Sequence, residues 1–371
     1  MQILYIAPLP PPVTGHSLVS QVFFDHLKER HQVKLVNFNK DSFVEGLSSF
    51  KRVFEVIDIL RQVRQGQRNA DVIYLTISES FLGNLKDLVI YLLCYKKLNC
   101  IYIHLHGGSI KKLLWDKNYL LFMLNKKFIK NLGGVIITGE SHNEVFQDFV
   151  SRNNLYIVPN FAQDYLFISD YEIKEKYLKI NKIKILFVSN MIEKKGYLEL
   201  TNAFIKLNDD LKEHIQIDFA GKFETEKQEH DFLSLISSYP NLFYHGVVEN
   251  EKKKELFNSA HVFALPTGFF EGQPVSILEA YASGCFVITT GQNGILDIFT
   301  NNINGYQFAD LYSDSIKEVL EKLILSKDFL KLVSLRNLHI AKQKYKKDIF
   351  NKSMTTILEK GVLESEGSQK Y

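Results

Sequence analysis

The stretch that decides the fold reads Phe270-Glu271-Gly272-Gln273-Pro274-Val275-Ser276-Ile277-Leu278-Glu279-Ala280. Its two carboxylates stand on either side of the start of an apolar helix. Proline suits a first helical turn, where its missing N–H is not needed, so Glu271 is expected in the preceding loop and Glu279 on the second or third turn. Apolar strands are expected on both sides, at residues 262–266 and 286–289.

The start of this helix predicts a site for an anion. The first backbone N–H groups of a helix have no partner within it, and the helix dipole favours negative charge there. A nucleotide sugar would place phosphates on these groups and sugar hydroxyls on the two acids. The alternative is a surface helix with two solvated acids. The apolar strands on both sides of the helix disfavour this alternative.

Short apolar strands alternate with helical segments along the whole chain, which is the pattern of a parallel α/β sheet. Strands are expected first at residues 3–7, 33–37, 72–77, 100–105, 134–138 and 155–158, and then at 183–188, 215–220, 242–245, 261–265 and 286–289. The segment 160–181 between the two series is expected to be a linker. The prediction is two doubly wound, Rossmann-like domains that bind ligands at the carboxyl ends of their strands, in a cleft between them.

The composition excludes several classes of protein. With 46% hydrophobic and 23% charged residues the chain is typical of a soluble globular protein, and a net charge of +3 is too small to indicate nucleic acid. Residues 1–165 hold 19 Lys and Arg against 14 Asp and Glu, so the amino-terminal half is the basic one. The three cysteines form no metal or disulfide pattern and suit a reducing cytoplasm. The longest apolar run, residues 88–95, is too short to span a bilayer.

The stretch around Glu271 and Glu279, with Leu265-Pro266-Thr267 before it, resembles the E-x7-E motif of the retaining glycosyltransferases of family 4. Those enzymes have the GT-B fold, and the likeness is to the subgroup that builds bacterial surface polysaccharides such as capsule and lipopolysaccharide. Matching segments run in order from Met1 to about Gly305. The resemblance implies an acceptor-side domain over residues 1–165, a nucleotide-sugar domain over 166–345, and a carboxyl-terminal helix with a polar tail, 346–371, that crosses back to the first domain.

The resemblance also implies roles for residues of the second domain. Glu271 would bind hydroxyls of the donor sugar and Glu279 the ribose. The diphosphate would lie on Lys195 and on the helix start, and the base near Val248; the residues of that helix start are Gly272, Gln273, Val275 and Ser276. Asn190 stands where the family pattern has an arginine, which leaves the second charge contact of the diphosphate open.

Two segments of the first domain match the family as well. Thr14 and Gly15 join a proline-rich loop to a helix, where the family contacts the donor phosphates; an ordinary β–α turn is the alternative. His106, at the end of a strand, matches the histidine that faces the donor sugar, so His106 and Glu271 are the catalytic candidates. His104 lies two residues earlier on the same face, either behind His106 or as a core residue with satisfied hydrogen bonds.

The resemblance, together with these features, implies a cytoplasmic, retaining hexosyltransferase that moves a sugar from a nucleotide diphosphate to a hydroxyl of a growing glycan. We expect no cofactor and no metal, because no Asp-x-Asp loop follows a strand. A nucleotide-sugar epimerase or a non-catalytic nucleotide-sugar-binding subunit would share the donor site and are the alternatives.

The last prediction concerns the membrane, because acceptors in the resembling subgroup are often lipid-linked. Residues 111–130 hold six lysines, one aspartate, Trp115 and Tyr119 around an apolar centre. A basic, aromatic helix of this kind predicts peripheral, reversible contact with the anionic inner face of the cell membrane. The alternative is a core-packed helix with solvated lysines.

Overall fold

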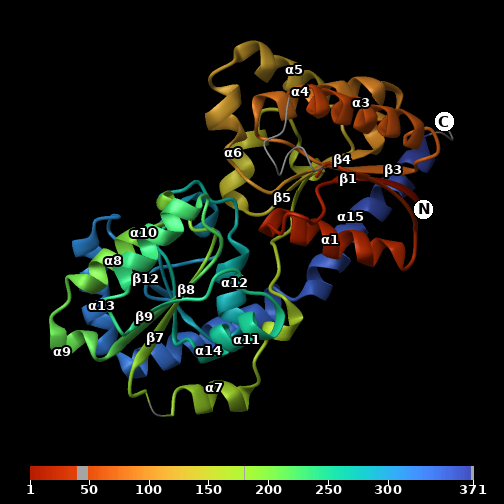
Figure 1. The fold of residues 1–371 in the computed structure, drawn as a ribbon. Helices are drawn as coiled ribbons and strands as arrows, with labels where there is room; N and C mark the ends of the chain where they lie inside the picture. Colours follow the sequence, from red (N-terminus) through yellow and green to blue (C-terminus); the bar gives the residue numbers. More distant parts are fainter. Residues whose placement is uncertain (40–48, 179, 369–371) are drawn as a thin grey trace. The chain divides into compact units, whose positions relative to one another are not determined.

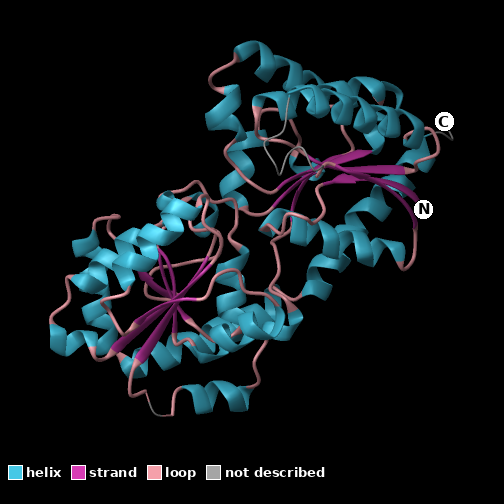
Figure 2. Cartoon of the chain, in the orientation of Figure 1, coloured by secondary structure: helices cyan, strands magenta, loops and turns pink. Residues whose placement is uncertain are grey.

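The computed structural model describes residues 1–39, 49–178 and 180–368 of the chain, drawn as a ribbon in Figure 1. It divides into two compact units. Unit 1 comprises Met1–Asn160 with Asp348–Tyr371, and unit 2 comprises Phe161–Lys347. Each unit is a layer of strands covered by helices on both faces (Figure 2). The domain limits expected from the sequence are at residues 165/166 and 345/346.

Unit 1 is built on a six-stranded parallel sheet in the order β2-β1-β3-β4-β5-β6. Its strands are β1 Gln2–Ala7, β2 Gln32–Asn37, β3 Val72–Thr76, β4 Ile101–Leu105, β5 Gly134–Ile137 and β6 Leu155–Ile157. The helices α3 Ser49–Gly66, α4 Phe81–Leu93 and α5 Tyr119–Ile129 cover one face, and α1 Gly15–Lys28 and α15 Lys347–Ser368 cover the other (Figure 1). Every residue of β3 and β4 is buried, as expected for central strands covered on both faces.

The carboxyl-terminal helix α15 is part of the core of unit 1. Met354 and Leu358 are fully buried, and the ring of Phe350 lies 6.0 Å from that of Phe23 on α1, centroid to centroid. At Gly361 an added Cβ would lie 2.0 Å from the hydroxyl oxygen of Tyr102, so helix and sheet are in close contact. The polar tail foreseen from Glu364 onward is helical to Ser368, and its last residues, 369–371, lie outside the described part of the chain.

Unit 2 has a six-stranded parallel sheet in the order β12-β11-β10-β7-β8-β9. Its strands are β7 Ile183–Val188, β8 Ile215–Ala220, β9 Leu242–Tyr244, β10 Val262–Leu265, β11 Phe286–Thr289 and β12 Gly305–Gln307. On one face lie α8 Tyr197–Ile205, α10 Glu226–Ile236 and α13 Ser313–Ile324; on the other lie α11 Asn250–Ser259, α12 Val275–Ala282 and α14 Lys327–Lys344 (Figure 1). Two shorter helices are α7 Asp170–Lys176 and α9 Asp209–Lys212.

The predicted fold class, two doubly wound α/β domains, is confirmed. Each predicted strand is present with limits within one residue of those expected, and the strand β12 was not predicted because its three residues carry no pattern. The segment 160–181 is not a linker. In its described residues Ile173 is fully buried, and the hydroxyl of Tyr177 donates a hydrogen bond to the carbonyl of His261 (2.8 Å), so this segment packs on unit 2.

Residues 111–130 also differ from the single helix that was expected. A five-residue π-helical turn, η2 Lys111–Trp115, precedes α5, whose first turn is capped by the side chain of Asn118. Trp115 is only 2% exposed and packs among Phe122, Phe146 and Phe149. It is therefore a core residue and cannot contact a membrane.

Each sheet reverses its direction of growth at one point, and these two points define where ligands are expected. In unit 1 the reversal lies between β1 and β3, and in unit 2 between β7 and β10. Open α/β sheets bind ligands outside the carboxyl ends of the strands at such a reversal. In unit 2 the loops that leave this point carry Lys195 and Glu271, and in unit 1 they carry Thr14 and Gly15.

Candidate functional site

Lys195 and Glu271 form an ion pair at the reversal point of the unit 2 sheet. The ammonium group of Lys195 contacts Oε1 of Glu271, and the hydroxyl of Thr267 donates to the same oxygen (3.1 Å). Glu271 is 7% exposed. A carboxylate this deeply buried needs a partner, and here it has a cation and a hydroxyl. Both residues are expected from the sequence to bind the donor, but their contact with each other was not predicted.

Two further residues, not predicted from the sequence, fix the pair. Thr267 is fully buried, and its hydroxyl oxygen accepts a hydrogen bond from the amide of Phe269 (3.0 Å). The ring of Phe269 lies 4.8 Å from the Lys195 ammonium, within range of a cation–π contact. Thr267 therefore links the bend of the loop to the carboxylate, and Phe269 flanks the cation.

Gly196 permits the close approach that brings Lys195 to this loop. Its φ is +84°, and a Cβ there would lie 1.8 Å from the carbonyl oxygen of Pro266. The amides of Gly268 and Phe269 both donate to the carbonyl of Lys194, at 2.8 and 3.1 Å. The loops after β7 and β10 are thus joined through their main chains. Only glycine fits at residue 196.

The helix α12 begins at Val275, and Pro274 lies just before it rather than in the first turn. Pro274 has φ −68° and ψ 115°, and its side chain makes no capping hydrogen bond. Among the described residues no partner is found for the amides of Val275 and Ser276, as is usual at a helix start. Gly272, Gln273, Val275 and Ser276 therefore surround a helix start beside the Lys195–Glu271 pair.

A second loop packs against this helix start. The amide of Gly294 donates to the carbonyl of Glu271 (3.3 Å), and a Cβ on Gly294 would lie 1.1 Å from the carbonyl oxygen of Gly272. Gly294 is therefore required for the two loops to meet, which agrees with a structural role for this segment.

Glu279 lies on the second turn of α12 and is 2% exposed. Its Oε1 accepts a hydrogen bond from the ammonium of Lys253 on α11 (2.7 Å), a partner that the sequence did not reveal. Burial, together with the negative charges of Glu279, Glu249 and Glu251, raises the pKa of Tyr165 to about 12. The carboxylate predicted to bind a ribose is thus already held by a lysine.

Asn190 and Val248 lie at the carboxyl ends of the same sheet. Asn190 is exposed after β7, and its carbonyl accepts a hydrogen bond from Ile192 (2.8 Å). Val248 is partly buried against the hydrophobic core, whereas its neighbour Val247 is 63% exposed. Of these two valines, Val247 is the one whose side chain is open to solvent.

In unit 1, Thr14 caps the helix α1, which begins at Gly15. Its hydroxyl oxygen accepts from the amide of Ser17 (3.1 Å), and the hydroxyl oxygen of Ser17 accepts from the amide of Thr14 (2.8 Å). The side chain of Thr14 is thus engaged in the reciprocal capping pattern. What remains for a ligand at this helix start is main chain, at the exposed Gly15.

His106 belongs to a stack of three imidazoles. Its ring centroid lies 3.9 Å from that of His104 and 4.1 Å from that of His16, the residue after Gly15. Within the described part of the chain, Nε2 of each of the three rings is buried without a hydrogen-bond partner. His104 is fully buried, and its Nδ1 lies 2.7 Å from the hydroxyl of Tyr74. His104 is therefore a core residue behind His106, and His16 was not predicted.

Burial keeps these three rings uncharged. It lowers the pKa of His16 to about 4 and that of His104 to about 3, with smaller effects from Lys86 on His16 and from His16 on His104. The pKa of His106 is well below its usual range, first through burial and then through His104 and His16. Near neutral pH His106 can therefore offer an uncharged imidazole to a ligand.

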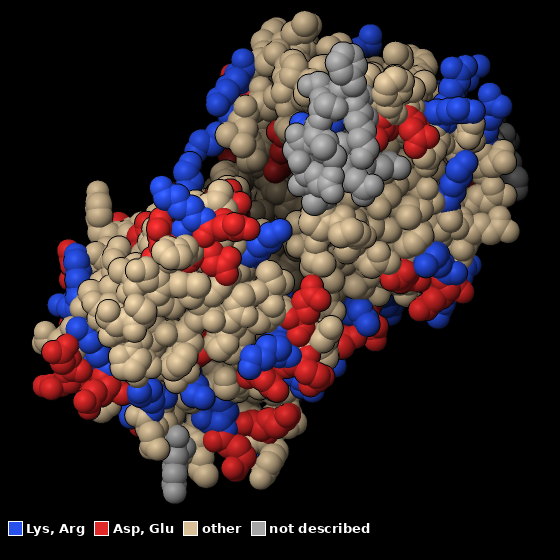
Figure 3. Space-filling model, in the orientation of Figure 1, with Lys and Arg blue, Asp and Glu red and all other residues tan. Residues whose placement is uncertain are grey.

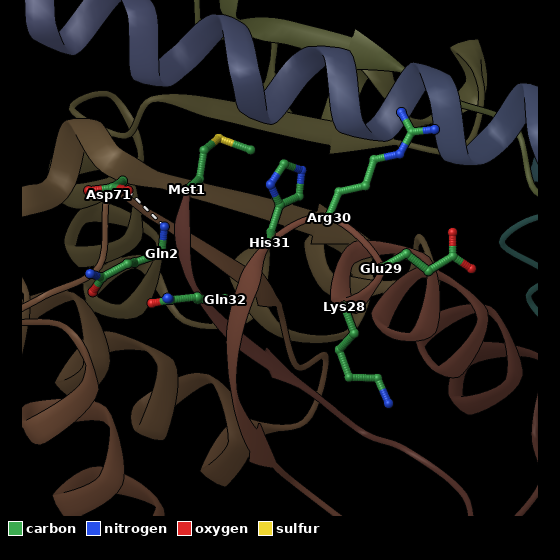
Figure 4. A pocket seen from close by; sticks show the side chains of 8 residues that line it. All are labelled: Met1, Gln2, Lys28, Glu29, Arg30, His31, Gln32 and Asp71. Atoms are coloured by element: carbon green, nitrogen blue, oxygen red, sulfur yellow. Dashed lines mark hydrogen bonds between the residues drawn. The ribbon is translucent and has the colours of Figure 1, made fainter.

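A hollow on unit 1 lies away from these residues (Figure 4). It is lined by Met1, Gln2, Lys28, Glu29, Arg30, His31, Gln32 and Asp71. These residues lie at the amino ends of β1, β2 and β3, at the end of α1 and in the turn that follows α1. Since ligands of parallel sheets bind at the carboxyl ends of strands, this hollow is not the candidate site.

Comparison with known proteins agrees with the second unit's architecture. The family model described as "Glycosyl transferases group 1" matches residues 169–338. This segment is therefore similar to the group 1 glycosyl transferases. The match includes Asn190, Lys195, Val248 and the whole stretch from Glu271 to Glu279.

Individual relatives cover more of the chain. An uncharacterized glycosyltransferase of Methanocaldococcus jannaschii is 26% identical over 271 residues, 70% of this chain and 68% of its own length. The capsular polysaccharide biosynthesis glycosyltransferase CapM of Staphylococcus aureus is 24% identical over 262 residues, 68% of each chain.

Among solved structures, HepE of Anabaena in complex with UDP and glucose superimposes with a TM-score of 0.74 at 14% identity, over 97% of this chain and 100% of that one. At this identity the likeness concerns the fold, which is that of the GT-B glycosyltransferases. The predicted GT-B fold is therefore confirmed.

Proposed function

We propose that this protein is a retaining glycosyltransferase that moves a sugar from a nucleotide-diphosphate sugar to a hydroxyl of a growing surface glycan, such as a capsule or lipopolysaccharide, without a metal ion. The observation that carries the proposal is the buried Lys195–Glu271 pair beside the start of α12, at the reversal point of a doubly wound sheet. A cation, open helix amides and a carboxylate acceptor are what a sugar diphosphate needs. The complex of the Anabaena relative with UDP and glucose supports a uridine nucleotide as the first donor to test.

The chemistry follows from charge and position. In a same-face substitution the acceptor hydroxyl attacks the anomeric carbon, the bond from that carbon to the phosphate oxygen breaks, and the leaving phosphate takes the acceptor's proton. Lys195 and the amides of Val275 and Ser276 would stabilise the charge that develops on the diphosphate. Glu271 would orient the sugar through its hydroxyls, and Glu279 would bind the ribose. The uncharged His106 would hydrogen-bond to the donor sugar.

The direct test measures release of nucleoside diphosphate and follows the product by NMR. UDP-glucose and other nucleotide sugars are first screened by thermal shift; a donor at about a hundred times its dissociation constant should stabilise the protein by ~2.7 kcal/mol. With an acceptor glycan, we expect nucleotide release in excess EDTA and a product whose anomeric configuration is that of the donor. Interconversion of donors without acceptor, or activity that needs added Mg²⁺ or Mn²⁺, would contradict the proposal.

The neighbouring lysine provides a matched control for the site. Lys194 is exposed and only its carbonyl joins the loop contacts, whereas Lys195 pairs with Glu271. Lys195→Ala should weaken donor binding, and Lys194→Ala should leave it within about twofold of the original, since an exposed lysine contributes little. Equal effects of the two changes would argue against the assignment of Lys195 to the diphosphate.

We further propose that unit 1 contacts an anionic membrane, where a lipid-linked acceptor would lie. No helix in the described residues is long and apolar enough to cross a bilayer, so the contact would be peripheral. The neighbouring helices α4 and α5, with η2 before α5, expose ten large apolar side chains. We call this surface the α4–α5 face; its residues are Phe81, Leu82, Leu85, Val89, Leu92, Leu113, Tyr119, Leu120, Met123 and Leu124.

Basic residues accompany the α4–α5 face. Lys111, Lys112, Lys117, Lys126, Lys127 and Lys130 lie on η2, on α5 or beside them, and Asp116 is the single acid of this segment. Figure 3 shows Lys and Arg side chains along the edge of unit 1 where Figure 1 draws the gold segment that contains α5. Exposed apolar side chains with lysines beside them suit the headgroup region of an anionic bilayer.

A further inference from the structure

Glu79 makes a set of contacts that the proposed reaction does not use. It lies in the loop between β3 and α4, and its Oε1 accepts hydrogen bonds from three successive amides, those of Gly108 (2.7 Å), Ser109 (2.8 Å) and Ile110 (3.1 Å). Its Oε2 accepts a fourth, from the hydroxyl of Ser109 (3.1 Å). A carboxylate that accepts several hydrogen bonds of this kind holds its partners firmly, because bonds to a charged acceptor are the strong ones.

The loop that Glu79 holds begins at His106. Gly107 follows the histidine, and a Cβ built on Gly107 would lie 1.9 Å from Oε2 of Glu79. The carboxylate therefore fills the space beside Gly107 and fixes the main chain immediately after His106.

The position of the His106 ring does not depend on a hydrogen bond to its Nε2 from any described residue. Its Nε2 is buried and has no hydrogen-bond partner among the described residues, and its ring is flanked by the rings of His104 and His16. Ring contacts limit movement of the imidazole toward the neighbouring rings but not movement within its own plane. The main chain that carries the ring is held by β4 before His106 and by the hydrogen bonds of Glu79 after it.

We propose that Glu79 is a positioning residue for His106: by binding the amides of residues 108–110 it fixes the main chain that carries the His106 imidazole toward the donor sugar. The inference rests on the proposed function for the role of His106, but the contact that it names belongs to unit 1 alone. The low pKa of His106 agrees with it, since an uncharged ring held in place can exchange hydrogen bonds with a hydroxyl.

The first test needs no activity. Histidine labelled with ¹³C at Cε1 gives one signal for each of the 11 histidines, and His106→Gln assigns that of His106. Glu79→Ala should shift and broaden the His106 signal, whereas Glu79→Gln, which keeps an oxygen for the three amides, should restore most of it. Glu144→Ala, at an exposed acid on α6 Asn143–Phe146, is the matched control and should change nothing. An unchanged His106 signal in folded Glu79→Ala would overturn the proposal.

The second test is a double-mutant cycle in the sugar-transfer assay. Glu79→Ala should lower kcat by roughly a hundredfold, the cost of a misplaced group, with a smaller effect on the KM of the donor, and Glu79→Gln should recover much of the loss. In the His106→Ala background the same change should cost little, because the group it positions is gone. A full additional loss in that background would refute positioning through His106. If the unmodified protein transfers no sugar, the proposed function fails while the NMR test still decides the contact.

Discussion

At the scale of single residues, the buried ion pair of Glu279 and Lys253 gives a direct prediction about the stability of unit 2. Lys253 stands in the run Lys252-Lys253-Lys254, which reads as a solvated helix face, yet its ammonium lies 2.7 Å from a carboxylate that is 2% exposed. Removing one partner of a buried pair leaves an uncompensated charge, and the usual cost is about 3–5 kcal/mol. Lys253→Met should therefore destabilise unit 2 by about 3 kcal/mol.

Urea denaturation followed by circular dichroism measures this loss. Lys252→Met is the matched control, because Lys252 pairs with Glu255 on the surface (3.3 Å) and such pairs contribute less than about 1 kcal/mol. The single tryptophan, Trp115, lies in unit 1, so its fluorescence reports the other unit and should change little. Equal destabilisation by the two substitutions would show that the buried pair contributes no more to the free energy of unfolding than the surface pair does.

The stacked histidines predict how the stability of unit 1 depends on pH. An unfolded histidine binds a proton below about pH 6.5. The buried rings of His16 and His104 do so only near pH 4 and pH 3. Their contribution is fully present above pH 6.5 and is lost as the pH falls, because the unfolded chain then binds more protons. For each such histidine, the free energy of unfolding falls by up to about 1.4 kcal/mol per unit of pH below 6.5.

His104→Gln should reduce the slope of the free energy of unfolding against pH, between about pH 6 and pH 4.5, by the amount that corresponds to roughly one bound proton. The glutamine amide can still form a hydrogen bond with the hydroxyl of Tyr74. Trp115 fluorescence in urea, repeated across that range, gives the slope. The control is His230→Gln at an exposed histidine of α10. A slope that His104→Gln leaves unchanged would mean that this ring is not kept uncharged by the fold.

At the scale of elements, substitutions at two glycines distinguish the cost of backbone strain from the cost of a steric clash. Gly196 and Gly246 both have positive φ, +84° and +67°, but a Cβ on Gly196 would meet the carbonyl oxygen of Pro266 at 1.8 Å, whereas a Cβ on Gly246 would meet nothing within 4 Å. Alanine in the left-handed region costs about 1–2 kcal/mol. Gly246→Ala should cost about that much, and Gly196→Ala more by about 1–3 kcal/mol, because the loops after β7 and β10 must move apart.

Chemical denaturation of the two variants measures the difference, and donor binding gives a second reading. Gly196→Ala should also weaken the donor, since it displaces Lys195, while Gly246→Ala should affect binding less. Equal stabilities would show that the loop yields easily at Gly196.

At the scale of the whole molecule, the sequence predicted what depends on local pattern. Buried parallel strands are continuous apolar runs in the sequence, so the strands of both sheets could be predicted. The helix start after Glu271 could be predicted from its proline. The contacts of Glu271 with Thr267 and Lys195, of Glu279 with Lys253, and of Glu79 with the loop after His106 were not predicted. Most of these pairs join residues tens of positions apart, and their chemistry is fixed by how loops meet at the end of a sheet. The burial of Trp115 agrees with the alternative of a core-packed helix at residues 111–130.

The last prediction concerns the α4–α5 face and an anionic membrane. Vesicles containing phosphatidylglycerol should co-sediment the protein at low salt, and high salt or neutral vesicles should release it, because each lysine near the surface adds about 1 kcal/mol of attraction that salt screens. Lys111, Lys112 and Lys117 replaced together by Gln should reduce binding at least tenfold. Leu82→Glu, at a side chain 77% exposed on α4, should do the same through the apolar contact.

The matched control removes equal charge elsewhere: Lys222, Lys227 and Lys252, all exposed on unit 2, replaced together by Gln. If net charge alone drove the association, this variant would lose as much binding as the first, and the face would have no special role. If the face is the contact, the control should bind vesicles nearly as the original does, and both triple variants should transfer sugar to a soluble acceptor at the original rate. Equal partitioning of the original protein into neutral and anionic vesicles would remove the electrostatic part of the proposal, since lysines gain nothing from an uncharged surface.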